Sequence, residues 1–383
     1  MTEANGEPDT ARMRVAYYSP MSPQRSGIAD YSALLLPALE RRVDVVLARP
    51  NRSHPPADAA LYQLGNNPEW HGWIYRALRR RPGLVVLHEV ALHGLIAGLT
   101  LGRGDRQGYL AAVERDGGAD ARLHAERALA GVEPPLWEVQ PDRFPLIREA
   151  LDFARGVVVH SGYAEGKVRA AGYEGPVHRV AYPAPSGEAR SVARLPAGRS
   201  PVIGSLGKVN SAKRIPQLLH AYSRLLRRFP NALLVLAGDG VGDRGIRLRL
   251  DALGLEAGKE VLLRGYVPAQ EFSALAAECN ICVSLRSPTL GETSASAIAA
   301  LAAETPLVVS DVGWFRELPD SVAAKIAPDE WEVAQLAAVL ELLASDVELQ
   351  RKMGSAGRSY VQREFSVERS AHGYAAALAE LVP

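Results

Sequence analysis

The chain has 383 residues, with 44 Lys plus Arg against 43 Asp plus Glu, a formal net charge of +1, and 47% hydrophobic residues. This length suggests two domains that each bury a core, and the composition excludes a disordered, collagenous or coiled-coil chain. The near-zero charge argues against a nucleic-acid-binding protein, for which a strongly basic face is expected.

The first dozen residues lack the order of a secretory signal. They are polar and carry acids at Glu3, Glu7 and Asp9, where a basic segment followed by an apolar one is required. No apolar run approaches the roughly 20 residues that a membrane helix needs. We therefore expect a cytoplasmic protein that does not span a membrane.

In the first half, short apolar runs alternate with segments of helical period, which predicts parallel strands joined by crossover helices. The expected strands are residues 15–18, 43–47, 59–62, 84–87, 157–159 and 178–180. The expected helices are residues 31–41, 73–80, 106–114, 121–129, 146–153 and 164–171.

The composition changes at residues 182–201, which are rich in proline and small residues and show no periodicity. We expect the domain linker there, with domains at 1–185 and 186–365. The second half repeats the rhythm, with strands expected at 202–206, 233–237, 261–264, 281–285 and 307–310 and helices at 215–228, 270–278 and 294–303. After Trp331 the chain is expected to be helical. The pattern predicts an α/β fold of two Rossmann-like parallel-sheet domains facing across a cleft, with ligands at the carboxyl ends of the strands.

The two cysteines, Cys279 and Cys282, do not indicate a metal or redox site. A zinc site made only of cysteines needs four of them, and the chain has two. Cys282 also lies in an apolar run that is expected to be a strand, and not at a helix N-terminus where a thiol is activated. We expect both to be buried, inert thiols.

The segment Gly240-Val-Gly242-Asp-Arg-Gly245 matches the dinucleotide pattern G-x-G-x-x-G. In that fingerprint an acidic residue at the end of the next strand holds the ribose, whereas here the strand ends at Arg264 and Gly265. The glycines also follow the second strand of their domain. We therefore expect no nicotinamide cofactor.

Two turns after strands contain residues suited to an anion. Gly27 lies where the first strand joins the first helix, so a ligand could approach its backbone and the helix amides closely, although a tight turn explains the segment equally well. In the second domain Gly207 precedes Lys208 and Lys213, two cations that could flank a diphosphate. An ordinary basic loop would have the same appearance.

A third turn joins another strand to the helix expected at 294–303. Glu292 is followed by Thr293, Ser294 and Ala295, small residues that leave backbone amides open to a phosphate while Glu292 can accept sugar hydroxyls. A helix-capping carboxylate is the competing interpretation.

Together these motifs resemble, over nearly the whole chain, a family-4 retaining glycosyltransferase of GT-B fold. The resemblance rests on segments at residues 26–32, 85–93, 207–213, 237–240, 265–267, 291–294 and 305–313. It implies a hexosyltransferase that uses a nucleotide diphosphate sugar as donor and a glycan, lipid or small molecule as acceptor. It also implies that no protein nucleophile is used, because the departing phosphate helps to deprotonate the acceptor. We expect a final helix, about residues 366–383, to pack back on the first domain.

The resemblance assigns roles on the donor side. Lys213 would bind the diphosphate, and Lys208 occupies the place where many relatives have arginine. Glu292 would hold the sugar as the first glutamate of the family's E-x7-E motif. The remaining donor-binding positions would be Gly27, Gly207, Gly265, Val267, Thr293, Ser294 and Ala295.

On the acceptor side, His88 ends a strand at the place where the family often keeps a histidine near the transferred sugar. A lone histidine there is frequently structural, and only the resemblance favours the catalytic interpretation. Asn66, Asp30 and Tyr31 are assigned to the acceptor side. His160 is expected to cap the helix that follows it.

One departure from the family concerns the ribose. The second glutamate of the motif is missing. Counting eight residues on from Glu292 gives Ala300, and matching the helix that leads to Pro306 gives Ala299, so ribose recognition differs or Glu292 has another role. A phosphorylase of the same fold and a catalytically silent nucleotide-sugar-binding module therefore remain alternatives. No cofactor or metal is expected, since no Asp-x-Asp triplet occurs and Asp239 and Asp243 have the wrong spacing.

Two surface segments suggest further contacts. Arg79, Arg80 and Arg81 could touch anionic lipids at the inner face of a membrane, at about 1 kcal/mol per charge, although a solvated helix end explains them equally well. Residues 99–143 are longer than a crossover requires and are expected to form a wall on the acceptor side.

Overall fold

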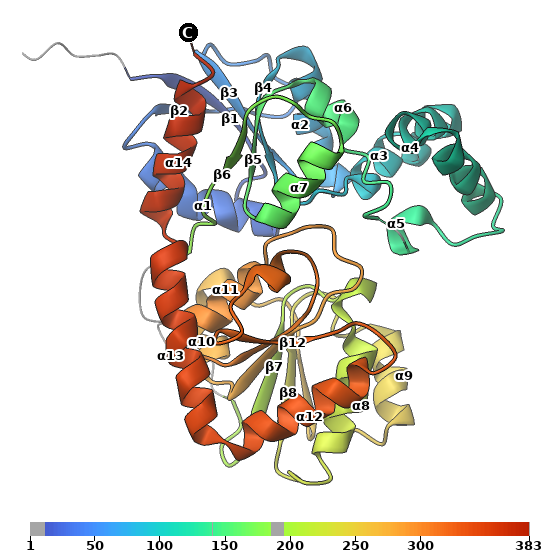
Figure 1. Ribbon diagram of the computed structural model, residues 1–383, viewed down its shortest axis with the longest axis vertical. Coiled ribbons are helices and arrows are strands. Elements are labelled where there is room, and N and C mark those ends of the chain that lie inside the picture. Colours follow the sequence, from blue (N-terminus) through green and yellow to red (C-terminus); the bar gives the residue numbers. More distant parts are fainter. Residues whose placement is uncertain (1–11, 140, 185–194, 383) are drawn as a thin grey trace, which may run out of the picture.

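The computed structural model describes residues 12–139, 141–184 and 195–382. Two parallel six-stranded sheets lie in two domains, one above the other, and helices cover both (Figure 1). The N-terminal residues 1–11 and the predicted boundary at residue 185 lie outside the described residues.

The first sheet has the strand order β2-β1-β3-β4-β5-β6. Its strands are β1 (Arg14–Tyr18), β2 (Asp44–Leu47), β3 (Ala59–Leu64), β4 (Gly83–Leu87), β5 (Ala154–Val159) and β6 (Val177–Arg179). Its helices are α1 (Gly27–Leu39), α2 (Pro68–Arg80), α3 (His93–Leu99), α4 (Arg106–Leu129), α5 (Leu136–Val139), α6 (Arg148–Asp152) and α7 (Gly162–Ala170).

The second sheet has the order β12-β11-β10-β7-β8-β9. Its strands are β7 (Val202–Leu206), β8 (Leu233–Ala237), β9 (Val261–Arg264), β10 (Ile281–Ser284), β11 (Leu307–Ser310) and β12 (Ala323–Ile326). The later helices are α8 (Ile215–Leu225), α9 (Arg244–Ala252), α10 (Ala269–Ala277), α11 (Ala295–Ala302), α12 (Glu332–Ser345), α13 (Val347–Glu364) and α14 (Val367–Ala379).

The predicted fold class is confirmed, and the differences are local. Strand β12 was missed, because Ala-Ala-Lys-Ile contains a single β-branched residue and gives a weak strand signal. The two helices expected at 106–114 and 121–129 are both present within α4, where Gly118, with a φ of 71° and a ψ of −166°, breaks the helical backbone between them. Glycine tolerates this left-handed conformation at no steric cost.

The helix starts follow from short polar side chains in the sequence. Ser26, Ser161, Ser294 and Ser366 each accept a backbone N–H in the first turn of the helix that follows. The prediction that His160 caps α7 is therefore wrong. Its Nδ1 lies 2.9 Å from the carbonyl oxygen of Val180, and Ser161 supplies the cap.

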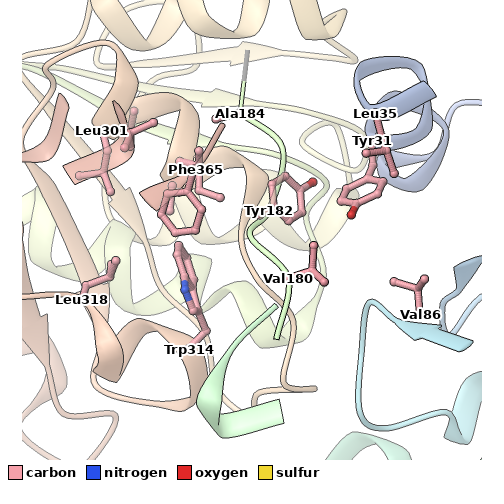
Figure 2. Close-up of a cluster of buried hydrophobic side chains, with 14 of the residues drawn as sticks. Tyr31, Leu35, Val86, Val180, Tyr182, Ala184, Leu301, Trp314, Leu318 and Phe365 are labelled. Atoms are coloured by element: carbon pink, nitrogen blue, oxygen red, sulfur yellow. The ribbon is translucent and has the colours of Figure 1, made fainter. Parts of the chain in front are cut away.

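The two domains do not have fully separate hydrophobic cores. One buried cluster runs from the face of the first sheet that α1 covers, through Tyr182 and Ala184, to Trp314 and Phe365 of the second domain (Figure 2). Helix α14 returns to the first domain and packs on α1, where the Tyr31 and Tyr374 hydroxyls are 2.6 Å apart. The two domains are therefore joined by apolar packing as well as by the chain.

Both cysteines are free and buried, as expected. Within the described residues, none of the helices combines the length and the apolar character that crossing a bilayer requires.

Candidate active site between the domains

The strand order of the second sheet reverses between β7 and β10, which are neighbours although their sequence positions are far apart. In open α/β sheets, ligands bind outside the carboxyl ends of the strands at such a switch point. The loop after β7 carries Lys213, and the loop after β10 carries Arg286 and Glu292. The two loops are tied together, since the Ser287 amide donates to the Ala212 carbonyl at 2.8 Å.

Lys213 is a buried cation at this point, with 7% of its surface exposed. Its Nζ is 3.5 Å from the carbonyl oxygen of Leu206. Gly207 has a φ of 110°, and a Cβ there would lie 3.4 Å from the same Nζ, so a side chain would be both strained and crowded. Burial, and then the positive charge of Arg286, lower the pKa of Lys213 to about 7.

Arg286 and Glu292 form an ion pair in the same loop. The Arg286 Nε is 2.6 Å from the Glu292 Oε1, and both side chains are largely buried. The other carboxylate oxygen accepts the Leu290 amide at 2.8 Å and the Thr289 hydroxyl at 3.3 Å. A carboxylate has about four acceptor positions, so Glu292 keeps capacity for one further hydroxyl at Oε1.

The N-terminus of α11 adjoins these side chains. Ser294 caps the helix and its hydroxyl lies 3.0 Å from that of Ser296, while a Cβ on Gly207 would be 3.9 Å from the Ser296 Oγ. The Thr293 hydroxyl is buried without a hydrogen-bond partner in the described structure. A polar atom left in this way is suited to a bound ligand. Ala299 and Ala300, the candidates for the second glutamate, are both buried.

The first domain approaches the same loop from the opposite side. The Val90 amide donates to the Leu290 carbonyl at 2.7 Å, and a Cβ on Gly291 would lie 2.2 Å from Val90 Cγ2. Glu89 is therefore held next to the Arg286–Glu292 pair. Its Oε2 accepts a hydrogen bond from the backbone N–H of Asn66 at 2.6 Å. Burial, and then the negative charge of Glu292, raise the pKa of Glu89 to about 7.

His88 is partly buried at the end of β4 and is hydrogen-bonded within the first domain. Its Nε2 is 2.6 Å from the Gln63 Oε1, and its ring packs edge-on against Tyr31 at a centroid distance of 4.7 Å. Burial, and then the nearby His160 and His71, hold the pKa of His88 well below its ordinary value. The side chain is therefore a neutral imidazole at pH 7.

The other predicted acceptor-side residues are placed differently from one another. Asp30 is exposed. Tyr31 differs from the expectation, because it is 1% exposed and its hydroxyl contacts Tyr374, so it faces α14 and not an open acceptor site. Asn66 uses its Oδ1 to accept the Leu95 amide at 3.0 Å and thereby holds the start of α3.

The remaining donor-side residues line the edge of the second sheet or face it. Lys208 is exposed, and the space beside Gly27 and Gly265 is open. The Gly265 carbonyl accepts the Gly238 amide at 3.0 Å, and Val267 packs on the buried cluster shared between the domains. Tyr266, between them, is 41% exposed and lies under the Arg25 guanidinium of the first domain at 4.9 Å.

Sequence reasoning missed Arg286, Glu89 and Tyr266 as site residues. Arg286 and Glu89 share one signal, since each is a charged residue within two positions of the end of a buried apolar strand. The carboxyl ends of parallel strands meet at the site, so this placement could have singled them out. Tyr266 gave no such signal, because its cation partner comes from the other domain.

Two expected surface contacts stay predictions. Arg79 pairs with Glu149 at 3.2 Å, and Arg81 donates to the Pro55 carbonyl at 3.0 Å, so two of the three arginines have protein partners. Helices α3, α4 and α5 project from the side of the first domain (Figure 1). Across the described ranges, no group of three or more His, Cys, Asp or Glu is placed to hold a metal ion.

Residues 189–360, somewhat less than half of the chain, match the family described as glycosyl transferases group 1. The comparison with curated proteins gives no match.

Solved structures share the fold. Sucrose-phosphate synthase from Thermosynechococcus elongatus is 19% identical, with a TM-score of 0.67, over 97% of this chain and 99% of that one. Anabaena HepE, solved with UDP and glucose, is 16% identical, with a TM-score of 0.63, over 96% of this chain and 100% of HepE. S. aureus TarM, solved with UDP, is 16% identical with a TM-score of 0.51, and this chain spans 45% of its length. The two parallel six-stranded sheets with their helices thus have the GT-B fold. The family match in the second domain supports a glycosyltransferase.

Proposed function

We propose that the chain is a retaining glycosyltransferase that moves a hexosyl residue from a nucleotide diphosphate sugar to a glycan, lipid or small-molecule acceptor. One observation carries the proposal. A buried lysine, an arginine and a helix N-terminus converge at the switch point of the second sheet, in the part of the chain that matches the glycosyl transferases.

The donor diphosphate is expected to lie between Lys213, Arg286 and the first amides of α11. Fixed cations and amides stabilise the charge that develops on a departing diphosphate with less reorganisation than water requires. The buried Lys213 is ready for this role, because a diphosphate beside it would favour its charged form. Glu292 would accept one sugar hydroxyl at its remaining position.

In the proposed reaction, the bond from the anomeric carbon to the diphosphate breaks and a bond to the acceptor oxygen forms on the same face of the sugar. The acceptor proton passes to a phosphate oxygen of the departing group. Hydrolytic glycosidases place two carboxylates on either side of the reacting bond. Here Glu292 is paired with Arg286, and burial favours the neutral form of Glu89, which supports transfer without a protein nucleophile.

The nucleotide is tested by a thermal-shift panel of UDP, GDP, dTDP and ADP. UDP is the first choice, because two of the similar structures were solved with it. Ligand that binds only the native state raises the unfolding midpoint. We expect one nucleotide to stabilise the wild type, and Lys213→Ala to lose that shift. Lys352→Ala, at an exposed lysine of α13 that pairs with Glu348, is the matched control and should keep it.

A second measurement follows the product. The matching nucleotide sugar is incubated with candidate acceptors, and the anomeric configuration of the product is read by proton NMR. Inversion would contradict the retaining mechanism. Release of a sugar phosphate that depends on inorganic phosphate would identify a phosphorylase. The silent-module interpretation gains if a nucleotide binds and no sugar is transferred, and the proposal fails if no nucleotide stabilises the wild type.

A further inference from the structure

A row of hydrogen-bonded polar side chains lies inside the first domain behind His88. The Gln63 Nε2 is 3.0 Å from the Tyr17 hydroxyl, which is 2.9 Å from that of Ser32. The Ser32 hydroxyl is 2.7 Å from that of Ser19, which donates to the Pro20 carbonyl at 3.0 Å. Tyr17, Ser19, Ser32 and Gln63 are all buried, so water does not compete for these contacts.

The number of available hydrogens determines which group donates in each of these hydrogen bonds. Four contacts join Gln63, Tyr17, Ser32, Ser19 and the Pro20 carbonyl. Burial raises the pKa of Tyr17, so all three hydroxyls carry their proton, and each supplies a single hydrogen. The carbonyl can only accept. Because three hydrogens cannot fill four contacts, the fourth comes from the amide nitrogen of Gln63.

The orientation of the Gln63 amide then determines the tautomer of His88. With its nitrogen on Tyr17, the amide presents its oxygen to the His88 Nε2 at 2.6 Å. An oxygen acceptor at that distance requires a hydrogen on Nε2. A neutral imidazole with Nε2–H carries its lone pair on Nδ1. In the described part of the chain Nδ1 has no hydrogen-bond partner, and it is accessible to solvent.

We propose that Gln63 is a positioning residue that holds His88 as the Nε2–H tautomer and thereby presents Nδ1 as a hydrogen-bond acceptor to a sugar hydroxyl in the cleft. His88 directly follows β4 and precedes Glu89 and Val90, which meet the loop that carries Glu292. The sugar contact rests on the proposed function, whereas the tautomer does not. The mechanism resembles metal sites, in which the partner of one ring nitrogen sets the role of the other.

The tautomer is measured directly on the wild-type protein without ligand. Histidine is labelled with 15N, and the two ring nitrogens are distinguished by their couplings to the ring protons. The nine histidines give separate patterns, and the set missing from His88→Gln belongs to His88. We expect a proton-bearing Nε2 and an unprotonated Nδ1 from pH 6 to pH 8. A proton on Nδ1 would overturn the inference.

Variants of Gln63 test whether it sets this state. Gln63→Leu removes the acceptor, and we expect signals of the Nδ1–H tautomer to appear. Gln63→Glu keeps an acceptor and adds a negative charge, so Nε2–H stays and His88 protonates at higher pH than in the wild type. The other groups that face His88 are His71, His160 and Tyr31, and neither variant changes them. Gln335→Glu, at a half-buried glutamine of α12, is the control and should leave the His88 signals unchanged. Unchanged signals in both Gln63 variants would overturn the positioning role.

The sugar contact is tested by comparing UDP with UDP-glucose in titration calorimetry. We expect Gln63→Leu to weaken the binding of UDP-glucose about tenfold, by analogy with the loss of an outer partner of a metal-bound histidine, and to leave the affinity for UDP within about twofold. An equal loss for both ligands would indicate general disruption and overturn the contact. If the wild type binds neither ligand, the comparison is made with the nucleotide that the thermal-shift panel identifies and its nucleotide sugar. The contact fails together with the proposed function if no nucleotide of the panel stabilises the wild type, while the NMR result still decides the tautomer.

Discussion

The two sides of the cleft differ in how they hold polar groups. The second domain buries charged groups, Lys213 and the Arg286–Glu292 pair, beside a helix N-terminus. The first domain presents His88 at the end of a neutral, fully hydrogen-bonded row of side chains. Preorganised charges suit an anion, whereas oriented neutral donors and acceptors suit hydroxyls. Under the proposed function, the contrast assigns the diphosphate to the second domain, whereas the sugar would be contacted from both sides, by Glu292 and by His88.

Glu89 differs from the neutral row of side chains in the first domain, because it carries an ionisable carboxyl group. Burial lowers the pKa of Lys213 and raises that of Glu89, and both reach about 7. In each case the low-polarity surroundings disfavour the charged form. A bound diphosphate would restore the charge of Lys213, but it would further disfavour that of Glu89. The following predictions test this division, from the largest expected effect to the smallest.

Arg286→Ala is expected to have the largest effect, because it removes a cation of the proposed diphosphate site and leaves Glu292 unpaired. Loss of one partner of a buried charge pair costs about 2–5 kcal/mol, so we expect UDP affinity to fall at least thirtyfold in titration calorimetry. Arg316→Ala, at an exposed arginine paired with Asp311, is the control. The Arg286→Met, Glu292→Gln double variant should recover stability without UDP binding. If it binds UDP normally, the charged-site interpretation is wrong.

Glu89→Gln is expected to stabilise the protein at high pH. The pKa of Glu89 is raised from 4.5 to about 7 on folding. The folded state therefore binds more protons than the unfolded state between these values, and stability falls as pH rises from 4.5 to 7. The variant removes this loss, which amounts to about 3 kcal/mol above pH 7.

Urea unfolding at pH 4.5 and pH 8 measures the difference. The stabilisation should appear at pH 8 and vanish at pH 4.5, whereas Glu174→Gln, at an exposed position, should be neutral at both. A variant that is less stable than the wild type at pH 8 would show that the Glu89 carboxylate is ionised and well solvated.

The affinity for UDP is expected to fall as pH rises above 7. The pKa of free Lys213 is about 7, and a bound diphosphate raises it, so binding takes up a proton above pH 7. The loss approaches tenfold, or about 1.4 kcal/mol, per pH unit. Titration calorimetry from pH 7.5 to 9.5 avoids the ionisation of the phosphate itself, whose second pKa is about 6. Lys213→Arg stays protonated, so its profile should lose the Lys213 contribution and fall less steeply than that of the wild type, keeping only the contribution of Glu89. Equal slopes for the two proteins would exclude Lys213 as a titrating group.

Tyr374→Phe should have the smallest effect and should test the contact between α14 and α1. It leaves the buried Tyr31 hydroxyl without its partner at 2.6 Å, which costs about 1–2 kcal/mol. Thermal unfolding measures the loss. Tyr266→Phe removes an exposed hydroxyl and should leave the midpoint unchanged. Equal midpoints for both variants would show that this hydrogen bond contributes nothing to the docking of α14.

Much of the fold could be predicted from the sequence, because parallel strands buried on both faces are short apolar runs separated by helical segments. Val202–Leu206, Leu233–Ala237 and Val261–Arg264 have the bounds that the sequence predicts. Strand β12 and the shared buried cluster could not be predicted. Strand β12 has four residues of mixed polarity, too few to show a strand periodicity. The shared cluster depends on contacts between residues far apart in the sequence, such as Tyr182 and Phe365.

The site was predictable only where a motif is local in sequence. Gly207, Lys213 and Glu292 lie on loops whose order along the chain carries the signal. The direction of the hydrogen bonds behind His88 depends on Gln63, Tyr17 and Ser32, which come from two strands and a helix. Periodicity gives no account of such a network, because buried polar residues interrupt the apolar pattern without indicating their partners.

The return of α14 to the first domain has a mechanical consequence. The chain passes between the domains twice, once after Ala184 and again at Phe365, and both residues belong to the same buried cluster (Figure 2). Moving the domains apart would have to separate this shared cluster and expose its apolar side chains to water, which opposes the movement. The two crossings therefore couple the domains through packing as well as through the covalent chain.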